Sequence, residues 1–343
     1  RLWYDMRSMP APAPPSDPTA RLAAALAARQ GWLDAAHRGA LRLFAGFYEG
    51  APELVVDLYA DTLVVHNYAA SAAAGADAVR RALAFYRGAL PWLRAAVVKH
   101  PHAPDADDRR GVLAFGDAPA REVTEHGVRY RVELRGARDA GFYLDTRGLR
   151  AFLKAEMAGR RVLNAFAYTG SLGVAALAGG ASRVVQLDAS QTFLNAAKES
   201  CTLNGLPIRR GDFVADDFWV AASRLRRADA RFDCVVLDPP FFATAPTGTV
   251  DLAHAADRLI NKVRPLVDDG GWLVAVNNAL FLRGSDYVAQ PEALCASGHL
   301  TLDRPIDVPP DVTGTAETRV AGPPVDPAPF NHPTKIAVLR VRR

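Results

Sequence analysis

Segments patterned as apolar strands alternate with segments patterned as amphipathic helices after Gly136, and this alternation constrains the fold more than any other feature. The apolar strand patterns cover residues 161–166, 184–188, 232–238 and 271–278. Helical patterns separate them near residues 171–178, 190–204 and 251–267. Continuously apolar strands that alternate with helices are typical of a parallel sheet with helices on its faces. The pattern predicts a Rossmann-like, doubly wound α/β sheet, which the strand pair at residues 303–310 and 334–343 closes with an antiparallel strand.

The part of the chain before Gly136 has a different pattern. Residues 9–18 are rich in proline and favour a tail or linker. An Ala-rich helix is expected at residues 21–38, and hairpin signals follow at residues 53–68 and 110–134. We therefore predict a Pro-rich tail or linker at residues 1–20, a smaller α+β domain rich in hairpins at 21–138, and the α/β domain at 139–343.

Composition excludes several other classes of protein. With 343 residues, 50% hydrophobic and 23% charged, the chain is globular and not disordered, collagenous or coiled-coil. The net charge of +4 only weakly suggests a polyanionic partner. No stretch is long and apolar enough to span a membrane, and neither the three cysteines nor the eight histidines have the spacing of metal ligands. We expect a cytoplasmic protein without a metal, and because it starts at Arg1 we leave open that a segment precedes it.

Three features in the α/β domain indicate a nucleoside cofactor. Residues 162–173 combine a strand, a turn with Gly170 and the start of a helix, which would let the backbone approach a ligand. Asp188 ends the next strand about 20 residues later, where a carboxylate typically binds the ribose hydroxyls. Asp217, or alternatively Asp216, could accept a hydrogen bond from adenine. The glycine turn is not GxGxxG, which disfavours a nicotinamide dehydrogenase.

The sequence DPPFF at residues 238–242 directly follows a predicted strand. Two prolines make the loop rigid, and because proline has no N–H its neighbours can present carbonyl groups to a cleft. Phe241 or Phe242 could stack on a flat ring. The alternative interpretation is a strand that ends at proline, with both aromatic rings in the core.

These motifs resemble a known family. Residues 142–343 are similar to class I S-adenosylmethionine-dependent methyltransferases, and more narrowly to the bacterial large-subunit ribosomal RNA methyltransferases that act on cytosine C5 or guanine N7. The similarity rests on GFYLDTRGLR, VLNAFAYTGSLGVAAL, VVQLDASQ, LNG and DPPFF, at residues 141–150, 162–177, 184–191, 203–205 and 238–242. Residues 42–65 also resemble the hairpin-rich domain of that family. The resemblance implies S-adenosylmethionine as the cofactor.

The resemblance also implies roles for individual residues. The methionine end of the cofactor would be lined by Phe142, Tyr143, Asp145 and Arg147. The main cofactor loop would comprise Asn164, Ala165, Phe166, Tyr168, Thr169 and Gly170. Ribose would be bound by Asp188 with Ala189 and Ser190, and adenine by Asp217. The acceptor side would comprise Asp238, which also lies beside the sulfonium, with Pro239, Pro240, Phe241 and Asn277.

The cysteines bear on the atom that is methylated. Methylation of cytosine C5 requires a thiolate that adds to the base. A nucleophilic cysteine is expected beside the DPPF loop or at the end of the next strand. The sequence has DPPFF at the first position and Asn277-Asn278 at the second, whereas Cys201, Cys234 and Cys295 lie elsewhere. The Asn pair resembles the guanine-N7 branch, although it could also be a hydrogen-bonded turn. We therefore predict transfer to a base nitrogen of RNA, first to guanine N7, without a covalent cysteine adduct.

Two other functions stay open at this point. A short N-terminus and a modest net charge favour a methyltransferase that acts on a small molecule or a protein side chain. A non-catalytic RNA-binding protein that retains a cofactor fold is disfavoured because the acidic and glycine positions are intact. The sequence does not decide whether the protein is a homodimer.

Overall fold

The computed structural model describes residues 17–137, 139–296 and 298–342 of the chain. Internal contacts divide these residues into two compact units. The first unit contains the described residues up to 127, residues 132–144 and residues 309–322. The second contains residues 128–131, 145–308 and those from 323 onward. A segment from the C-terminal part of the sequence therefore belongs to the N-terminal unit.

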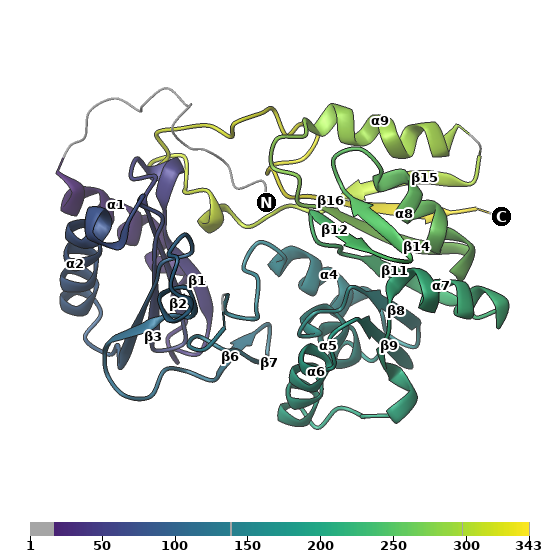
Figure 1. Cartoon of the computed structure of the whole chain (residues 1–343), viewed down its shortest axis with the longest axis horizontal. Coiled ribbons are helices and arrows are strands. Elements are labelled where there is room, and N and C mark those ends of the chain that lie inside the picture. Colours follow the sequence, from purple (N-terminus) through teal and green to yellow (C-terminus); the bar gives the residue numbers. More distant parts are fainter. Residues whose placement is uncertain (1–16, 138, 297, 343) are drawn as a thin grey trace. The chain divides into compact units, whose positions relative to one another are not determined.

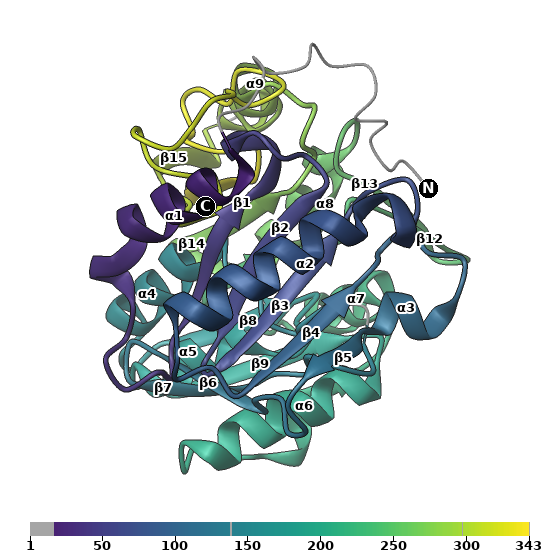
Figure 2. The same cartoon turned by 90° about the vertical axis from the view of Figure 1, so that its left-hand side faces the viewer.

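A five-stranded sheet forms the first unit, and its strands follow one another in sequence order. They are β1 (Ala40–Ala45), β2 (Leu54–Tyr59), β3 (Thr62–Asn67), β4 (Ala95–Lys99) and β5 (Val112–Phe115). Neighbouring strands are antiparallel except β3 and β4, which are parallel and are connected through α2 (Ala72–Ala89). Both α2 and α1 (Pro18–Arg29) pack on the same face of this sheet, where α2 crosses its strands (Figure 2).

The sequence of α2 explains where this helix begins and which of its faces is buried. Ser71 is its N-cap, and the side chain accepts a hydrogen bond from the backbone N–H of Ala74. Val79, Ala82 and Tyr86 recur at helical spacing and are buried against the sheet. The unit also contains η2 (Gln30–Trp32), η3 (Gly46–Glu49), α3 (Ala106–Arg110), β6 (Glu122–Glu125) and η6 (Pro310–Val312).

The second unit is a seven-stranded sheet in the order β10-β9-β8-β11-β14-β16-β15 (Figure 1). Its strands are β8 (Arg161–Ala165), β9 (Arg183–Asp188), β10 (Phe213–Ala215), β11 (Phe232–Leu237), β14 (Val267–Asn277), β15 (Leu300–Pro305) and β16 (Lys335–Val341). The first five strands in this order are parallel, and β16 is antiparallel to both of its neighbours. This sheet confirms the predicted Rossmann-like fold with a closing antiparallel strand, and the five-stranded sheet confirms the smaller N-terminal part.

Helices of the second unit connect these strands. They are α4 (Arg147–Glu156), α5 (Ser171–Ala178), α6 (Gln191–Leu203), α7 (Phe218–Arg227), α8 (Ala256–Val263) and α9 (Gly284–Cys295). A core on one face of the sheet joins Leu163, Val235 and Leu273 to side chains of α7, α8 and α9. The remaining elements are η4 (Arg210–Asp212), η5 (Arg264–Leu266), β7 (Val128–Arg131) and the hairpin β12 (Phe242–Ala245) to β13 (Gly248–Asp251). Among the residues that the structure describes, every helix is too short or too polar to cross a membrane.

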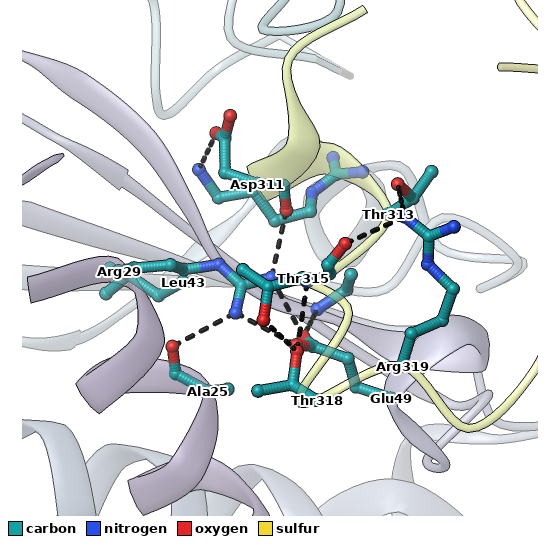
Figure 3. Close-up of polar contacts among 12 residues, drawn as sticks. Ala25, Arg29, Leu43, Glu49, Asp311, Thr313, Thr315, Thr318 and Arg319 are labelled. Atoms are coloured by element: carbon teal, nitrogen blue, oxygen red, sulfur yellow. Dashed lines mark hydrogen bonds and ion pairs between the residues drawn. The ribbon is translucent and has the colours of Figure 1, made fainter. Parts of the chain in front are cut away.

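A buried ion pair holds residues 309–322 in the first unit (Figure 3). The guanidinium of Arg29 donates to both carboxylate oxygens of Glu49, at 2.9 and 3.0 Å, and to the carbonyl of Asp311 at 3.0 Å. The hydroxyl of Thr318 also donates to Glu49. Because Arg29 and Glu49 are both almost completely buried, this network fixes the C-terminal segment against the N-terminal sheet.

Three predicted elements differ from the structure. The helix expected at residues 21–38 begins at Pro18 and ends at Arg29, where η2 follows it. The helix expected at residues 251–267 is limited to α8, because β13 precedes it and η5 follows it. The strand expected at residues 303–310 begins earlier, at Leu300, and ends at Pro305. Proline has no N–H to donate to a ladder, so Pro305 and the prolines at 309 and 310 favour an early end of the strand.

Candidate cofactor and acceptor site

The parallel strands of the second unit bring several predicted site residues to one edge of the sheet. Ala165, at the end of β8, is level with the residues of β9 and β11 that directly precede Asp188 and Asp238. Asn277 is the last residue of the next strand, β14. Open parallel sheets bind ligands outside the carboxyl ends of their strands. The sheet therefore places these predicted residues where a nucleoside cofactor of this fold would bind.

The loop after β8 has a strained backbone. Phe166 and Tyr168 have φ angles of 57° and 51°, and Gly170 has a φ of 76°. Such angles cost a residue other than glycine about 1–3 kcal/mol, and they persist where the surroundings impose them. Here Asp188 imposes one of them, because its Oδ2 accepts a hydrogen bond from the backbone N–H of Tyr168 at 2.8 Å. This strain, at the loop predicted to hold the cofactor, is typical of a functional site.

The glycines of this loop have a packing role that differs from the sequence interpretation. A Cβ on Gly170 would lie 2.4 Å from the Cβ of Ala197, and one on Gly173 would lie 2.4 Å from the side chain of Gln186. The space beside both glycines is thus filled by protein and is not open to a ligand. Glycine is needed so that the start of α5 can approach β9 and α6 closely.

Asn164 is connected to the loop after β8 by a chain of hydrogen bonds through Gln186. It is completely buried, and its Nδ2 donates to Oε1 of Gln186 at 2.8 Å. The Nε2 of Gln186 in turn donates to the carbonyl of Gly170 at 3.2 Å. These contacts give Asn164 a positioning function, whereas its Oδ1 has no hydrogen-bond partner within the described residues, so its predicted contact with the cofactor stays a prediction.

Asp188 and Ser190 connect the cofactor loop to α6. The two carboxylate oxygens of Asp188 accept hydrogen bonds from the backbone N–H groups of Tyr168 and Ser190, each at 2.8 Å. Ser190 is the N-cap of α6, and Ala189 between them is exposed. A carboxylate oxygen can accept two hydrogen bonds. Asp188 can therefore position the loop and still accept the two hydroxyls of a ribose.

The two candidates for the adenine carboxylate have different partners. Asp216 uses both of its oxygens, because Oδ1 accepts from the backbone N–H of Asp217 at 2.8 Å and Oδ2 pairs with Arg224 at 2.6 Å. Asp217 is the N-cap of α7, and its Oδ1 accepts from the backbone N–H of Val220 at 3.1 Å. The ion pair with Arg224 compensates the charge of Asp216, whereas Asp217 has no ion pair among the described residues, and this difference favours Asp217 as the adenine ligand, which stays a prediction.

Asp238 holds a carboxyl group with an unusual pKa. Burial, and then the negative charge of Asp145, raise the pKa of Asp238 to about 7. Asp145 is fixed by the hydroxyl of Thr334, which donates to its Oδ2 at 3.1 Å. Sequence reasoning missed Thr334 because it lies nearly two hundred residues from Asp145 along the chain, at a separation of 189. The available signal was its position directly before the last strand.

The Asn277-Asn278 pair divides into a structural and an accessible member. Asn277 is completely buried, its Nδ2 donates to the carbonyl of Leu252 at 2.9 Å, and its Oδ1 accepts from the N–H of Ala279 at 2.9 Å. Asn278 is partly exposed, and its Nδ2 lies 3.5 Å from the carbonyl oxygen of Pro239. Within the described residues the Oδ1 of Asn278 has no hydrogen-bond partner. Asn277 was the predicted site residue and stays a prediction, while Asn278 has a buried Oδ1 that no group among the described residues satisfies.

Lys335 fixes the same loop from the neighbouring strand. It is completely buried, and its Nζ donates to the carbonyls of Ala279 and Pro333 at 2.8 and 2.7 Å. Burial lowers the pKa of this ammonium group to about 8. With Asn277, this lysine determines the path of the chain on either side of Asn278.

The DPPFF loop presents one exposed ring. Pro239 is buried and Pro240 is exposed, while Phe241 packs against the core on the α7–α9 face. Phe242 is 55% exposed. The sequence left open which phenylalanine could stack on a flat ring, and in the structure Phe242 is the accessible one.

The residues predicted at the methionine end are divided between the units. Phe142 is buried in the first unit, and its carbonyl accepts a hydrogen bond from the hydroxyl of Tyr59 at 3.2 Å. Tyr143 belongs to the same unit and donates to Asp139 at 3.2 Å. Asp145 and Arg147, the first residue of α4, belong to the second unit. Of the cofactor loop, Ala165 and Thr169 are buried.

Two thiols are unsuited to nucleophilic attack. Cys201 in α6 and Cys234 in β11 are both completely buried. Burial raises the pKa of Cys201 to about 11 and that of Cys234 to about 12. Since the thiolate is the nucleophile, neither side chain is activated for covalent catalysis. The side chain of Cys295 lies outside the described part of the chain.

The fold and this edge of the sheet define a class of protein. The chain belongs to the family of S-adenosylmethionine-dependent methyltransferases, whose family model matches residues 41–320. This match confirms the resemblance found in the sequence, to a family of methyltransferases whose cofactor is S-adenosylmethionine. The acidic and loop residues at the strand ends fit this cofactor, since Asp188 and Asp217 supply acceptors for hydroxyl and amino groups.

Individual relatives narrow the comparison. The chain is 36% identical over 204 residues to the "Ribosomal RNA large subunit methyltransferase I" of Aeromonas salmonicida, and the match covers 59% of this chain and 51% of that protein. It is 33% identical over 248 residues to the protein of the same description from Photobacterium profundum, covering 70% of this chain and 62% of that one. The chain thus spans between half and two thirds of the length of these relatives.

The similarity to solved structures shows that the fold is shared, and it shows the fold only. The structure of SMU.776, a methyltransferase complexed with SAH, superposes with a TM-score of 0.81 at 20% identity and covers 96% of this chain and 83% of that one. A SAM-dependent methyltransferase from Streptococcus mutans gives a TM-score of 0.78, also at 20% identity, and covers 96% of this chain and 82% of that one. Both have the same architecture as this protein.

Proposed function

We propose that the enzyme transfers the methyl group to a base nitrogen of RNA, specifically ribosomal RNA of the large subunit, without a covalent cysteine adduct. Guanine N7 is the first candidate atom, because the Asn277-Asn278 pair resembles the guanine-N7 branch of the family. The description of the relatives as ribosomal RNA large subunit methyltransferases supports RNA as the substrate. Such a substrate would place the enzyme in the cytoplasm.

One observation carries the proposal for nitrogen. Around the DPP loop, the groups that could contact an acceptor are the carboxyl of Asp238, the carbonyl of Pro239 and the Oδ1 of Asn278. All three groups accept hydrogen bonds, and Asp238 can also donate one when it is protonated. These groups include no thiol, which is the observation that favours nitrogen, because transfer to a ring nitrogen needs no thiolate adduct.

The residues of the chain contribute by orientation and charge. When bound, S-adenosylmethionine supplies a methyl group on a sulfonium, and the lone pair of the acceptor nitrogen takes this carbon while the electrons of the carbon–sulfur bond stay on sulfur. Asp238 in its ionised form would stabilise the positive charge that is present before transfer. Asn278 and the Pro239 carbonyl would orient the base, and Phe242 would stack on it. A well-aligned pair of reactants can account for a large part of the rate.

Labelled cofactor and ribosomal RNA provide the test. RNA from a strain that lacks the gene is incubated with the enzyme and methyl-labelled S-adenosylmethionine, and the product nucleosides are separated by mass spectrometry. We expect label in a base that is methylated on nitrogen. Asp238→Ala should abolish transfer, because it removes the carboxyl group at the head of the loop.

Asp229→Ala provides the matched control. Asp229 is also an aspartate of the second unit, but its side chain is 81% exposed and pairs only with Arg231 among the described residues. This variant should methylate RNA at the rate of the unaltered enzyme. If label appears in 5-methylcytosine, or if Asp238→Ala retains activity within a few-fold, the proposal fails.

A further inference from the structure

An aromatic pocket lies on the first unit, outside the cofactor and acceptor site. Its lining includes the apolar residues Leu41, Leu58 and Ala60 and the aromatic residues Trp32, His37 and Trp92. We infer that this pocket, called the Trp32 pocket below, binds an unpaired base of single-stranded RNA. The inference rests on the proposed function, because it assumes an RNA substrate, and it assigns a second contact to that substrate.

Ring geometry makes the pocket suitable for a flat ligand. The rings of His37 and Trp92 are stacked, with centroids 3.9 Å apart and planes inclined by 11°. Trp32 is 45% exposed, although tryptophan side chains usually bury most of their surface. Stacking on aromatic side chains is how proteins bind unpaired bases without strong sequence preference. The pocket therefore combines a rigid pair of rings with an accessible third ring.

His37 is held in an unfavourable conformation. Its φ angle is 53°, in the left-handed region, and its N–H donates to the carbonyl of Asp34 at 2.9 Å. The carboxylate of Asp34 accepts from the backbone N–H groups of Ala36 at 3.0 Å and Arg38 at 2.8 Å, which closes the turn around His37. Residues other than glycine in this region are uncommon, and they are concentrated at ligand-binding sites.

The same histidine has a polar atom that the protein does not satisfy. Within the described residues the Nδ1 of His37 is buried and has no hydrogen-bond partner. A buried polar atom without a partner costs about 1–3 kcal/mol, so its retention indicates a ligand that completes it. The polar edge of a base could supply that hydrogen bond while its face stacks on a ring.

Two arginines are close in sequence to aromatic residues of the pocket. Arg38 directly follows His37 and is exposed, and Arg94 lies two residues after Trp92 with its side chain 81% exposed. Two carboxylates offset their charge, since Asp34 lines the pocket and Asp61 lies 3.5 Å from Arg94, so the aromatic rings and not a net charge carry the inference. Arginines beside aromatic rings are suited to contact the phosphates that flank a stacked base.

Binding of a short, fluorescein-labelled oligoadenylate to the full chain tests the inference. Trp32→Ala removes the exposed ring, and His37→Asn removes the stacked ring while keeping a residue that tolerates a positive φ. Each should weaken RNA binding by about five- to tenfold, and Trp32→Phe should restore most of it. Val112→Ala is the matched control, because Val112 is a 50% exposed apolar residue of the same unit outside the pocket.

Two further readouts separate the possible failures. S-adenosylmethionine affinity, measured by calorimetry, should stay unchanged in all four variants, since none is placed at the cofactor. If the unaltered enzyme binds RNA but Trp32→Ala and His37→Asn bind it equally well, the pocket is not an RNA site and the proposed function stands. If the unaltered enzyme does not bind RNA, the proposed substrate and this inference both fail. Loss of binding in Val112→Ala as well would also contradict a specific pocket.

Discussion

Among single residues, Asp238 has a charge state that depends strongly on its surroundings. Its pKa of about 7 is far above the usual value for an aspartate, first because of burial and second because of the nearby charge of Asp145. The neutral form is therefore favoured below neutral pH in the protein without ligand. A positively charged sulfonium beside the carboxyl would favour the ionised form instead, so cofactor binding and loss of this proton are linked.

This linkage predicts a pH dependence of cofactor affinity. Below the pKa, binding of S-adenosylmethionine must remove the proton from Asp238, so affinity should rise as the pH rises from about 6 to about 8 and then level off. S-adenosylhomocysteine has a neutral sulfur and should show a much smaller rise. Calorimetric titrations at several pH values would measure both. Asp238→Asn, which cannot ionise, should abolish the difference between the two ligands, and an unchanged profile in that variant would contradict the assignment.

The residue scale also shows where prediction from sequence ends. The order of Gly170, Asp188 and Asp238 could be interpreted because each follows a strand whose apolar pattern is clear. The different environments of Asn277 and Asn278 could not be predicted, because Asn277 donates to the carbonyl of Leu252, which lies in the turn between β13 and α8. The function of Gly173 likewise depends on Gln186 of the neighbouring strand. Contacts between elements, and not local pattern, decide such questions.

At the scale of elements, strands were predictable where they are buried on both faces. β8, β9 and β11 lie close to their predicted bounds because their apolar runs are continuous. The hairpin of β12 and β13 was missed, since its strands are four residues each and half-exposed, so no apolar run marks them. The return of residues 309–322 to the first unit was also unpredictable, because its contacts join residues more than 260 positions apart, such as Thr318 and Glu49 at a separation of 269.

Loss of the Glu49 carboxylate should release this returning segment and destabilise the protein. Glu49→Ala leaves Arg29 buried without its partner, which typically costs about 3–5 kcal/mol. Urea denaturation should show this as a lower midpoint of unfolding. Asp77→Ala is the control, because Asp77 forms exposed ion pairs with Arg80 and Arg81 and its loss should cost less than about 1 kcal/mol. Equal effects of the two variants would show that the buried network does not hold the segment.

At the scale of the whole molecule, the acidic site residues and the proposed RNA pocket belong to different units. Asp145, Asp188, Asp217, Asp238 and Asn278 belong to the second unit, whereas the Trp32 pocket belongs to the first. Variants of the pocket should therefore affect RNA binding, and variants of the cofactor residues should affect the affinity for S-adenosylmethionine. The absence of an activated thiol among the described side chains has the broadest consequence, since it concerns the reaction course of the entire enzyme.

An enzyme without cysteines should remain active if no covalent adduct forms. Replacing Cys201, Cys234 and Cys295 together with alanine should leave methyl transfer within a few-fold of the unaltered rate, because no step of a nitrogen-directed transfer requires a thiolate. Some stability should be lost, since Cys201 and Cys234 are completely buried and their removal leaves small cavities that cost about 1 kcal/mol each. Activity is measured with labelled cofactor at a temperature where the variant is folded.

RNA containing 5-fluorocytosine provides the complementary measurement on the unaltered enzyme. A cysteine nucleophile would add to C6 of the fluorinated base and, after methyl transfer to C5, could not be released, because C5 carries fluorine in place of the proton whose removal expels the thiolate. We expect no complex that survives denaturing electrophoresis, because the two described thiols are buried and protonated at neutral pH. A stable complex, together with loss of activity in the cysteine-free variant, would instead identify a cysteine nucleophile and assign the methyl group to carbon.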